Sequence, residues 1–187
     1  MNRVIRDIPA HHIVAGNTRS SLRMDIQAYM KQHGTSCRCI RCREIKKQKV
    51  DPEALQLKDF QYQAALADEH FLQFVTSEDS IAGYLRLSLP ANNAPQTGIL
   101  ELQNAALIRE IHIYGQSLPV GSEQSGAAQH IGLGTELIEK ACKIAGRAGF
   151  SSVAVIAAIG TRMYYQSRGF ERGEFYMIRQ LEKTLKE

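Results

Sequence analysis

The chain has 187 residues, a formal net charge of +4 and a hydrophobic fraction of 44%. This length is typical of one domain with an appendage, and the hydrophobic fraction is enough for a buried core. No apolar run approaches the ~20 residues of a membrane-spanning helix, and the charged first residues contain no apolar segment typical of an export signal. The composition therefore excludes an integral membrane protein and predicts a cytoplasmic protein with no membrane partner.

Positive charge is concentrated in the first fifty residues. Residues 1–50 hold eleven Lys/Arg and three Asp/Glu, a local charge of +8, whereas residues 51–187 have a local charge of −4. Together with Pro52, this contrast predicts a basic linker at 1–50 and a globular domain at 51–187. A basic segment can bind a polyanion or can simply be solvated, and charge alone leaves both readings open.

The first predicted element is a helix at 18–33. Leu22, Ile26 and Met30 repeat there at helical spacing, and Gly34 supplies the stop. We therefore expect an amphipathic helix whose basic residues lie away from its hydrophobic stripe.

Three cysteines follow this helix within six residues: Cys37, Cys39 and Cys42. In a chain without an export signal, clustered cysteines are more typical of metal ligands than of disulfides. The spacing Cys-x-Cys-x-x-Cys can place three thiolates around one tetrahedral Zn²⁺, and the neighbouring arginines would favour the thiolate form. Ordinary cysteines without a metal are the alternative reading.

A tetrahedral zinc site of this kind needs a fourth ligand from elsewhere in the chain. His12, His33, His70 and His112 are all possible, and each of them could instead be a hydrogen-bonded structural residue. His33 is close in sequence, but a histidine on a packed strand is held more rigidly. We therefore favour His112 as the fourth ligand.

The globular part opens with strands. Segments at 55–66, 71–75 and 81–87 are separated by turns and predict an antiparallel meander. A loop rich in Asn, Pro and Gly follows. The next segment, 107–114, alternates between apolar and polar residues only in part, so we expect a central strand.

A glycine-rich segment lies between this strand and a predicted helix at 135–148. Its sequence is Gln129-His130-Ile131-Gly132-Leu133-Gly134-Thr135. Glycine lets backbone N–H groups approach a phosphate, and the positive end of the helix dipole adds to the attraction. The segment lacks the third glycine of the dinucleotide-binding fingerprint. It therefore indicates either an anion site of another class or an ordinary strand–helix turn.

The last elements complete a mixed sheet. A continuous apolar run at 153–158 predicts a strand that is buried on both faces. A short helix at 161–168 and a final strand at 175–181 follow it. With the meander before them, these elements predict an α+β fold around a mixed sheet.

The order of these motifs resembles that of the GNAT acetyltransferases. Gln-x-x-Gly-x-Gly at 129–134 is similar to the acetyl-CoA pyrophosphate loop of that family, and Tyr-x-x-x-Gly-Phe at 165–170 is similar to its tyrosine motif near the thioester. In GNAT enzymes, acetyl-CoA lies in a splay between the fourth and fifth strands. The resemblance implies the GNAT fold, a mixed sheet flanked by helices, with acetyl-CoA as cofactor.

Longer segments resemble one branch of this family, the catalytic subunit of Elongator. The segments similar to its acetyltransferase domain are Arg109–Gly115, Gln129–Gly134 and Gly160–Tyr165. The segments similar to the linker before that domain are Arg6–Pro9 and Cys37–Glu44, and the Cys-x-Cys-x-x-Cys form looks like that of bacterial and archaeal members. The resemblance covers essentially the whole chain.

The resemblance implies a part in tRNA modification. Members of the family synthesise carboxymethyl-type modifications at C5 of the wobble uridine, U34, with acetyl-CoA as the acetyl source. Their radical-SAM domain, with its cluster and S-adenosylmethionine, performs the carbon chemistry, and we expect this chain to be a fragment or truncated form without it. The chain is thus expected to be an acyltransferase domain with bound zinc that hydrolyses acetyl-CoA in response to tRNA, as a partner of that radical-SAM domain.

Three groups of residues are expected to carry these functions. The expected acetyl-CoA-binding residues are Glu110, Ile111, His112, Ile113, Gln129, His130, Ile131, Gly132, Leu133, Gly134, Thr135 and Tyr164. The expected catalytic residues are Tyr164 and Tyr165, as hydrogen-bond donors or as orienters of an attacking water, and the motif by itself favours Tyr165. The residues expected to contact the tRNA backbone are Arg38, Arg41, Arg43, Lys46, Lys47 and Lys49.

Two other functions fit the same residues. A protein lysine N-acetyltransferase would use the same acetyl-CoA site, but it needs a peptide groove and a base for the amine proton. Glu110 is a candidate for that base, unless it is held in an ion pair. A non-catalytic RNA-binding module could keep a vestigial acyl-CoA pocket.

Overall fold

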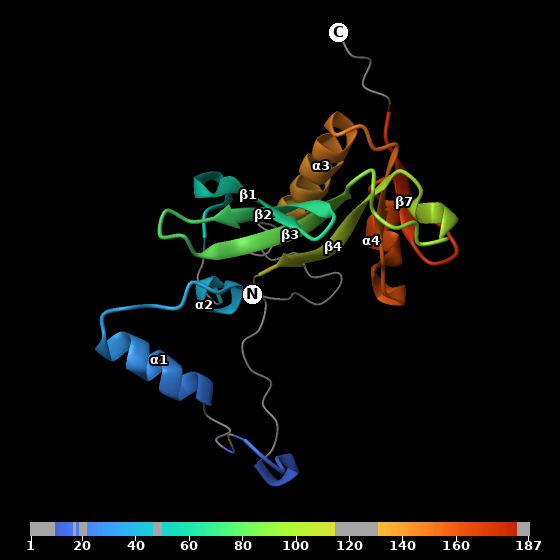
Figure 1. Cartoon of the computed structure of the whole chain (residues 1–187). Coiled ribbons are helices and arrows are strands. Elements are labelled where there is room, and N and C mark those ends of the chain that lie inside the picture. Colours follow the sequence, from blue (N-terminus) through green and yellow to red (C-terminus); the bar gives the residue numbers. More distant parts are fainter. Residues whose placement is uncertain (1–9, 17, 19–21, 47–49, 115–130, 183–187) are drawn as a thin grey trace. The chain divides into compact units, whose positions relative to one another are not determined.

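The computed structural model describes residues 10–16, 18, 22–46, 50–114 and 131–182 (Figure 1). The chain divides into two compact units, Met1–Glu44 and Ile45–Glu187. The predicted boundary near residue 50 lies a few residues beyond this division. The described part of the first unit is helical, and the second unit contains the sheet.

The first unit contains a short 3-10 helix, Ala10–His12, and two α-helices, α1 (Leu22–Gln32) and α2 (Ile40–Arg43). α1 lies within the helix predicted at 18–33. The stop predicted at Gly34 has a φ of +65°, the left-handed conformation that glycine adopts most easily. α1 has no buried residue among its described side chains, so packing within this unit depends little on its hydrophobic stripe.

The second unit is built around a seven-stranded sheet with the order β1-β2-β3-β4-β5-β7-β6. Its strands are β1 (Gln56–Ala64), β2 (Ala67–Val75), β3 (Ile81–Pro90), β4 (Ala105–Ile113), β5 (Ser152–Val155), β6 (Glu171–Arg172) and β7 (Met177–Gln180). Every neighbouring pair is antiparallel except β4 and β5, which are parallel. The predicted meander and the predicted mixed sheet are therefore confirmed.

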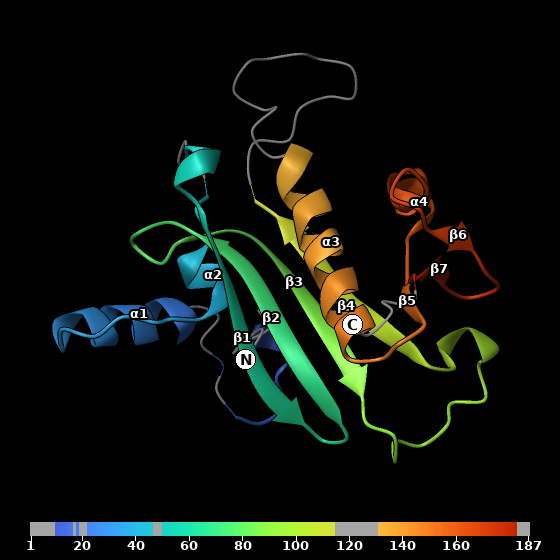
Figure 2. The same cartoon turned by 90° about the horizontal axis from the view of Figure 1, so that it is seen from above.

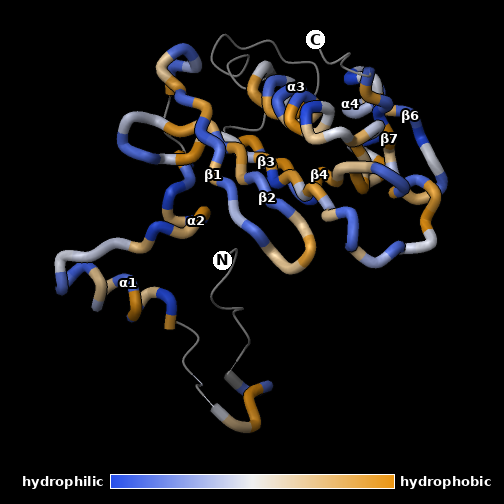
Figure 3. The backbone as a smooth tube through the Cα atoms, turned by 45° about the horizontal axis from the view of Figure 1, so that its top comes forward, coloured by the Kyte–Doolittle hydropathy of each residue, from blue (hydrophilic) through white to orange (hydrophobic). Residues whose placement is uncertain are grey.

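One long helix, α3 (Ile131–Arg147), packs on one face of the sheet along β2 to β5 (Figure 2). Its buried side chains recur every three or four residues, as in other amphipathic helices. They are Leu133, Leu137, Ile138, Ala141, Cys142 and Ala145. Hydrophobic residues also run along β3 and β4, where they join the same core (Figure 3). Neither α3 nor any other helix in the described part of the chain has the length and apolarity needed to traverse a bilayer.

α3 begins earlier than the helix predicted at 135–148. Gly132 and Gly134 therefore lie in its first turn and not in a turn before it. Neither glycine has a positive φ, so both adopt a backbone conformation that is open to any residue. What distinguishes them at this place is the absence of a side chain.

After β5 the chain leaves the sheet sooner than predicted. The strand predicted at 153–158 ends at Val155, and the next residue, Ile156, is 69% exposed. A 3-10 turn, Ile159–Thr161, then leads into α4 (Arg162–Gln166), which lies within the predicted short helix. β7 lies within the predicted last strand, whereas β6 was not predicted because two residues show no periodicity. The remaining 3-10 turns of the described chain are Pro52–Ala54 and Leu100–Leu102.

Candidate functional site

The central feature of the second unit is the place where β4 and β5 part. The two strands are paired only up to Ile108, which lies opposite Val155. β5 ends at Val155, whereas β4 continues to Ile113. In between, the pairing of β4 with β3 shifts and leaves Arg109 as the extra residue of a β-bulge, and a bulge bends the strand that contains it. From Arg109 to Ile113, β4 therefore has β3 on one side and no described strand on the other.

The backbone groups on this open side can be identified from one hydrogen bond. The N–H of Tyr114 donates to the carbonyl of Ala82 on the β3 side at 2.8 Å. In an antiparallel pair, successive residues direct their N–H and C=O groups alternately toward and away from the partner strand. Ile111 and Ile113 therefore direct both groups to the open side. A ligand with amide groups could bind there as an additional strand would.

The first turn of α3 lies beside this open edge. A Cβ atom on Gly134 would be 3.6 Å from Cγ1 of Ile113. The first four N–H groups of an α-helix have no acceptor within the helix and form the positive end of its dipole. They can therefore bind an anion such as a phosphate. Gln129 and His130, which were predicted to belong to this anion site, lie outside the described residues.

Tyr164 of α4 reaches the same place. Its side chain is partly buried, and its hydroxyl occupies the space beside Gly134 that a Cβ atom would need. The Cζ atom of Arg168 lies 3.5 Å from the centre of the Tyr164 ring, and its Nε donates to Oγ1 of Thr135 at 3.0 Å. Burial raises the pKa of Tyr164, although the charge of Arg168 acts in the opposite direction. The phenol is therefore protonated at neutral pH and can act as a hydrogen-bond donor.

Tyr165 occupies a different environment. It is only 5% exposed and belongs to the hydrophobic core. Its ring meets the edges of Phe170 and Tyr164, with centroids 5.5 and 5.4 Å away. The structure therefore gives Tyr165 extensive packing contacts and places the Tyr164 hydroxyl at the first turn of α3. A catalytic role for either tyrosine stays a prediction.

Glu110 lies next to the bulge, and three polar side chains surround its carboxylate. Oη of Tyr84 donates to it at 2.9 Å, Nη1 of Arg86 donates at 3.3 Å, and Nε2 of His112 lies 3.1 Å away. Burial, followed by the hydrogen bond to Glu110, raises the pKa of Tyr84. The sequence left open whether Glu110 is a base or a member of an ion pair. In the structure it forms an ion pair with Arg86.

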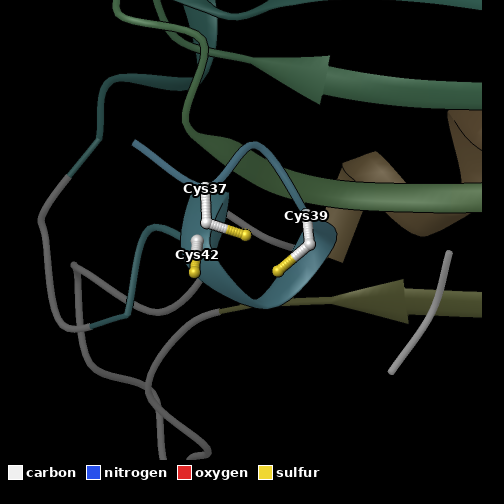
Figure 4. Close-up of side chains that lie close together, drawn as sticks. All are labelled: Cys37, Cys39 and Cys42. Atoms are coloured by element: carbon white, nitrogen blue, oxygen red, sulfur yellow. The ribbon is translucent and has the colours of Figure 1, made fainter. Parts of the chain in front are cut away.

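The three clustered cysteines of the first unit lie together, as the spacing predicted (Figure 4). The Sγ atoms of Cys37, Cys39 and Cys42 all lie within 4.8 Å of one another. Two side chains of α1 also contact this cluster: Nη2 of Arg23 donates to Cys42 Sγ at 3.1 Å, and Nε2 of Gln27 donates to it at 3.3 Å. Three thiols and a cationic donor fit a thiolate-rich zinc site.

The pKa of Cys39 favours metal binding. Burial acts to raise this pKa, but hydrogen bonds from the Cys42 backbone and from neighbouring side chains outweigh it and lower the pKa to about 7. By contrast, burial raises the pKa of Cys142 in α3 to about 11. The clustered Cys39 is therefore partly ionised at neutral pH, whereas Cys142 is a neutral core residue.

The fourth zinc ligand stays a prediction. His112, the favoured candidate, is on β4 beside Glu110 as described above. Nδ1 of His33 lies 2.8 Å from the carbonyl oxygen of Tyr29, and Nδ1 of His70 lies 2.8 Å from a carboxylate oxygen. Imidazole has two nitrogens, so each of these histidines keeps a second one for another partner.

The residues predicted to contact RNA are described in part. Those within the described residues are Arg38, Arg41, Arg43 and Lys46. Arg41 and Lys46 are exposed to solvent. Lys47 and Lys49 lie outside the described residues. The basic segment therefore presents charge at its surface on both sides of Glu44.

Sequence reasoning missed three residues that hold the predicted ones in place. Arg168 stacks on Tyr164, and Arg23 and Gln27 donate to Cys42. The available signal was a spacing of four residues, both from Tyr164 to Arg168 and from Arg23 to Gln27. Residues four apart share a helix face and can act on the same partner.

The two glycines of the α3 first turn should respond differently to alanine. Gly134→Ala should lower the free energy of unfolding by about 1–3 kcal/mol, because the new Cβ collides with the Tyr164 hydroxyl. Gly132→Ala is the matched control, since a Cβ there meets no atom of the described residues within 4 Å and should gain up to about 1 kcal/mol of helix propensity. Denaturant unfolding measures both changes. Equal effects of the two variants would contradict this reading of Gly134.

The metal-free protein should show a reactive Cys39. The rate of its alkylation by iodoacetamide should reach half of its plateau at about pH 7, because only the thiolate reacts and the thiol form dominates below that pH. Cys142 should stay unmodified at pH 8, and Zn²⁺ should protect all three clustered cysteines. Peptide mass spectrometry gives the rate for each cysteine. A midpoint near the ordinary thiol value of about 8.5 would contradict the prediction.

The chain was compared with protein-family models and with known proteins. No protein-family model matches the chain. It is 36% identical over 187 residues to the tRNA uridine(34) acetyltransferase of Dehalococcoides mccartyi, covering 97% of this chain and 40% of the relative. It is 38% identical over 186 residues to Elongator complex protein 3 of Danio rerio, covering 96% of this chain and 33% of the relative.

A solved structure of an archaeal relative is also similar to this chain. The archaeal Methanocaldococcus infernus Elp3 with an N-terminal deletion matches with a TM-score of 0.75 and 32% identity, covering 96% of this chain and 44% of that one. The chain thus spans less than half the length of each of these proteins. The predicted resemblance is confirmed: the chain belongs to the family of the tRNA uridine(34) acetyltransferases and Elongator complex protein 3, and it is homologous to the C-terminal part of their chains.

Proposed function

We propose that this chain binds acetyl-CoA and cleaves its thioester as the acetyl-transferring part of a tRNA wobble-uridine-modifying enzyme. One observation carries the proposal. At Gly134, the first turn of α3, the open edge of β4 and the hydroxyl of Tyr164 meet within contact distance. A diphosphate needs an anion site, an amide-containing arm needs backbone groups to pair with, and a thioester needs a proton donor. The start of α3, the edge of β4 that pairs with no described strand, and the phenol of Tyr164 match these three needs.

Each part of the site has a binding role in this proposal. The N–H groups at the start of α3 bind the diphosphate. Ile111 and Ile113 pair through their backbone with the two amides of the pantetheine arm, as an added strand would. The acyl end of the ligand is proposed to lie beside Tyr164. Acetyl-CoA, when bound, supplies an activated acetyl group.

Tyr164 is proposed to act as a proton donor. Hydrolysis transfers the oxygen of water to the acetyl carbon and breaks the carbon–sulfur bond, so the departing sulfur needs a proton. A phenol whose pKa is raised by burial keeps its proton at neutral pH and can deliver it to that sulfur. The proton lost by water then restores the phenol, which leaves acetate, free CoA and one proton in solution.

The first unit is proposed to bind zinc, and the basic segment around its end is proposed to contact the tRNA. Cys37, Cys39 and Cys42 would hold Zn²⁺ as thiolates, which orders the loop between α1 and α2. The basic side chains from Arg38 to Lys49 would neutralise phosphates of the RNA backbone and position it without reading its sequence. The complete modification is proposed to need the radical-SAM domain that the family resemblance implies.

Release of free CoA from acetyl-CoA tests the proposal. Turnover by the chain should increase when tRNA is added, and Tyr164→Phe should lower kcat by about 100-fold because the proton donor is lost. Tyr165→Phe is the matched control on the same helix and should lose much less. A loss confined to Tyr165→Phe would move the donor role to that residue.

Two further outcomes of this assay decide between functions. Turnover that ignores tRNA but requires a lysine peptide would replace the proposal with a protein acetyltransferase. Tight RNA binding without measurable acetyl-CoA affinity would indicate a binding module with a vestigial pocket.

Charge reversal tests the RNA contact. The double variant Lys46→Glu/Lys47→Glu should weaken tRNA binding and reduce the slope of log K against log salt concentration by about 2, because each lost phosphate contact removes about one unit. Lys140→Glu/Lys143→Glu makes the same charge change on α3 and should leave this slope unchanged. Fluorescence anisotropy across a salt series measures it. An unaltered slope in the first variant would rule out these two contacts.

A further inference from the structure

The Arg168 side chain contacts both α4 and α3 beside the proposed acyl site. Nη1 donates to the carbonyl of Tyr164 at 2.7 Å and to Oγ of Ser167 at 3.1 Å. Nε donates to Oγ1 of Thr135 at 3.0 Å. The guanidinium also lies 3.5 Å from the centre of the Tyr164 ring. One side chain therefore connects α4 with the first turn of α3.

These contacts fix the Tyr164 ring from two sides. The guanidinium covers the ring, and the hydroxyl at the ring's far end lies against the backbone of Gly134. Tyr165 adds an edge contact at a centroid distance of 5.4 Å. A half-buried phenol without such contacts would be free to turn about its side-chain bonds, which costs directionality in any hydrogen bond that it makes.

We propose that Arg168 is a positioning residue that clamps Tyr164 against the first turn of α3, so that its hydroxyl stays directed at the proposed acyl site. The inference rests on the proposed function of Tyr164. Arg168 itself need not touch the substrate. It acts by stacking on the ring and by donating to Thr135, which sets the distance between α4 and the start of α3.

The geometry requires an arginine and not merely a positive charge. The planar guanidinium stacks on an aromatic ring and donates in fixed directions at the same time. A lysine ammonium is a point charge on a flexible stem and cannot reproduce the stack together with all three hydrogen bonds. Arg168→Lys should therefore behave more like Arg168→Ala than like the wild type.

A double-mutant cycle separates this role from general stability. Arg168→Ala should lower kcat for acetyl-CoA hydrolysis by about tenfold because the phenol is misplaced, with a change in KM of less than about twofold. In the Tyr164→Phe background, the same substitution should change kcat by less than about twofold, since the hydroxyl it positions is already absent. Arg162→Ala, at the start of α4, is the control and should leave kcat unchanged in both backgrounds.

A second measurement does not depend on activity. In protein labelled with 3-fluorotyrosine, the ¹⁹F resonance of Tyr164 is identified by its loss in Tyr164→Phe. Arg168→Ala and Arg168→Lys should shift and narrow this resonance, because the ring gains freedom, whereas Arg162→Ala should not. An unchanged resonance, or an equal loss of kcat in both backgrounds of the cycle, would overturn the positioning role. A wild-type chain that neither binds nor hydrolyses acetyl-CoA would instead refute the proposed function, and the resonance would still decide whether Arg168 clamps the ring.

Discussion

The divergence of β4 from β5 beyond Ile108 is the constraint on which the proposed acyl site depends. Backbone N–H and C=O groups that leave a ladder must find other partners, in water or in a ligand. The bulge at Arg109 bends β4 at the point where its pairing with β5 stops. The same strand therefore serves the core at its start and offers a binding edge at its end.

The first turn of α3 and the Tyr164 side chain of α4 lie beside this edge. They can approach each other closely because Gly134 has no side chain. Gly134 has no Cβ, and the hydroxyl of Tyr164 fills that space. The two tyrosines of α4 are adjacent in sequence, so they point in directions about 100° apart on the helix. One ring is thereby buried in the core, and the other reaches the first turn of α3. Arg168 then holds the second ring in place.

Charge is organised differently in the two units. In the second unit, acidic side chains pair with arginines of the same unit. The pairs are Glu69 with Arg109, Glu110 with Arg86, and Glu139 with Arg179. The first fifty residues carry the excess of positive charge, and Arg23 shares in the cysteine cluster. An excess of positive charge in one segment is the distribution that attracts a polyanion to that segment.

The sequence by itself determined most of the elements, the cysteine cluster and the family, because hydrophobic periodicity, cysteine spacing and glycine motifs are local patterns. The meander, the buried strand and the amphipathic helix were all predictable from such patterns. Only the tertiary structure decided the bulge at Arg109, the separate environments of Tyr164 and Tyr165, and the contact of Arg168 with Thr135. These features depend on strand register and on contacts between residues more than thirty positions apart, and no local periodicity records which side chains will meet across such distances.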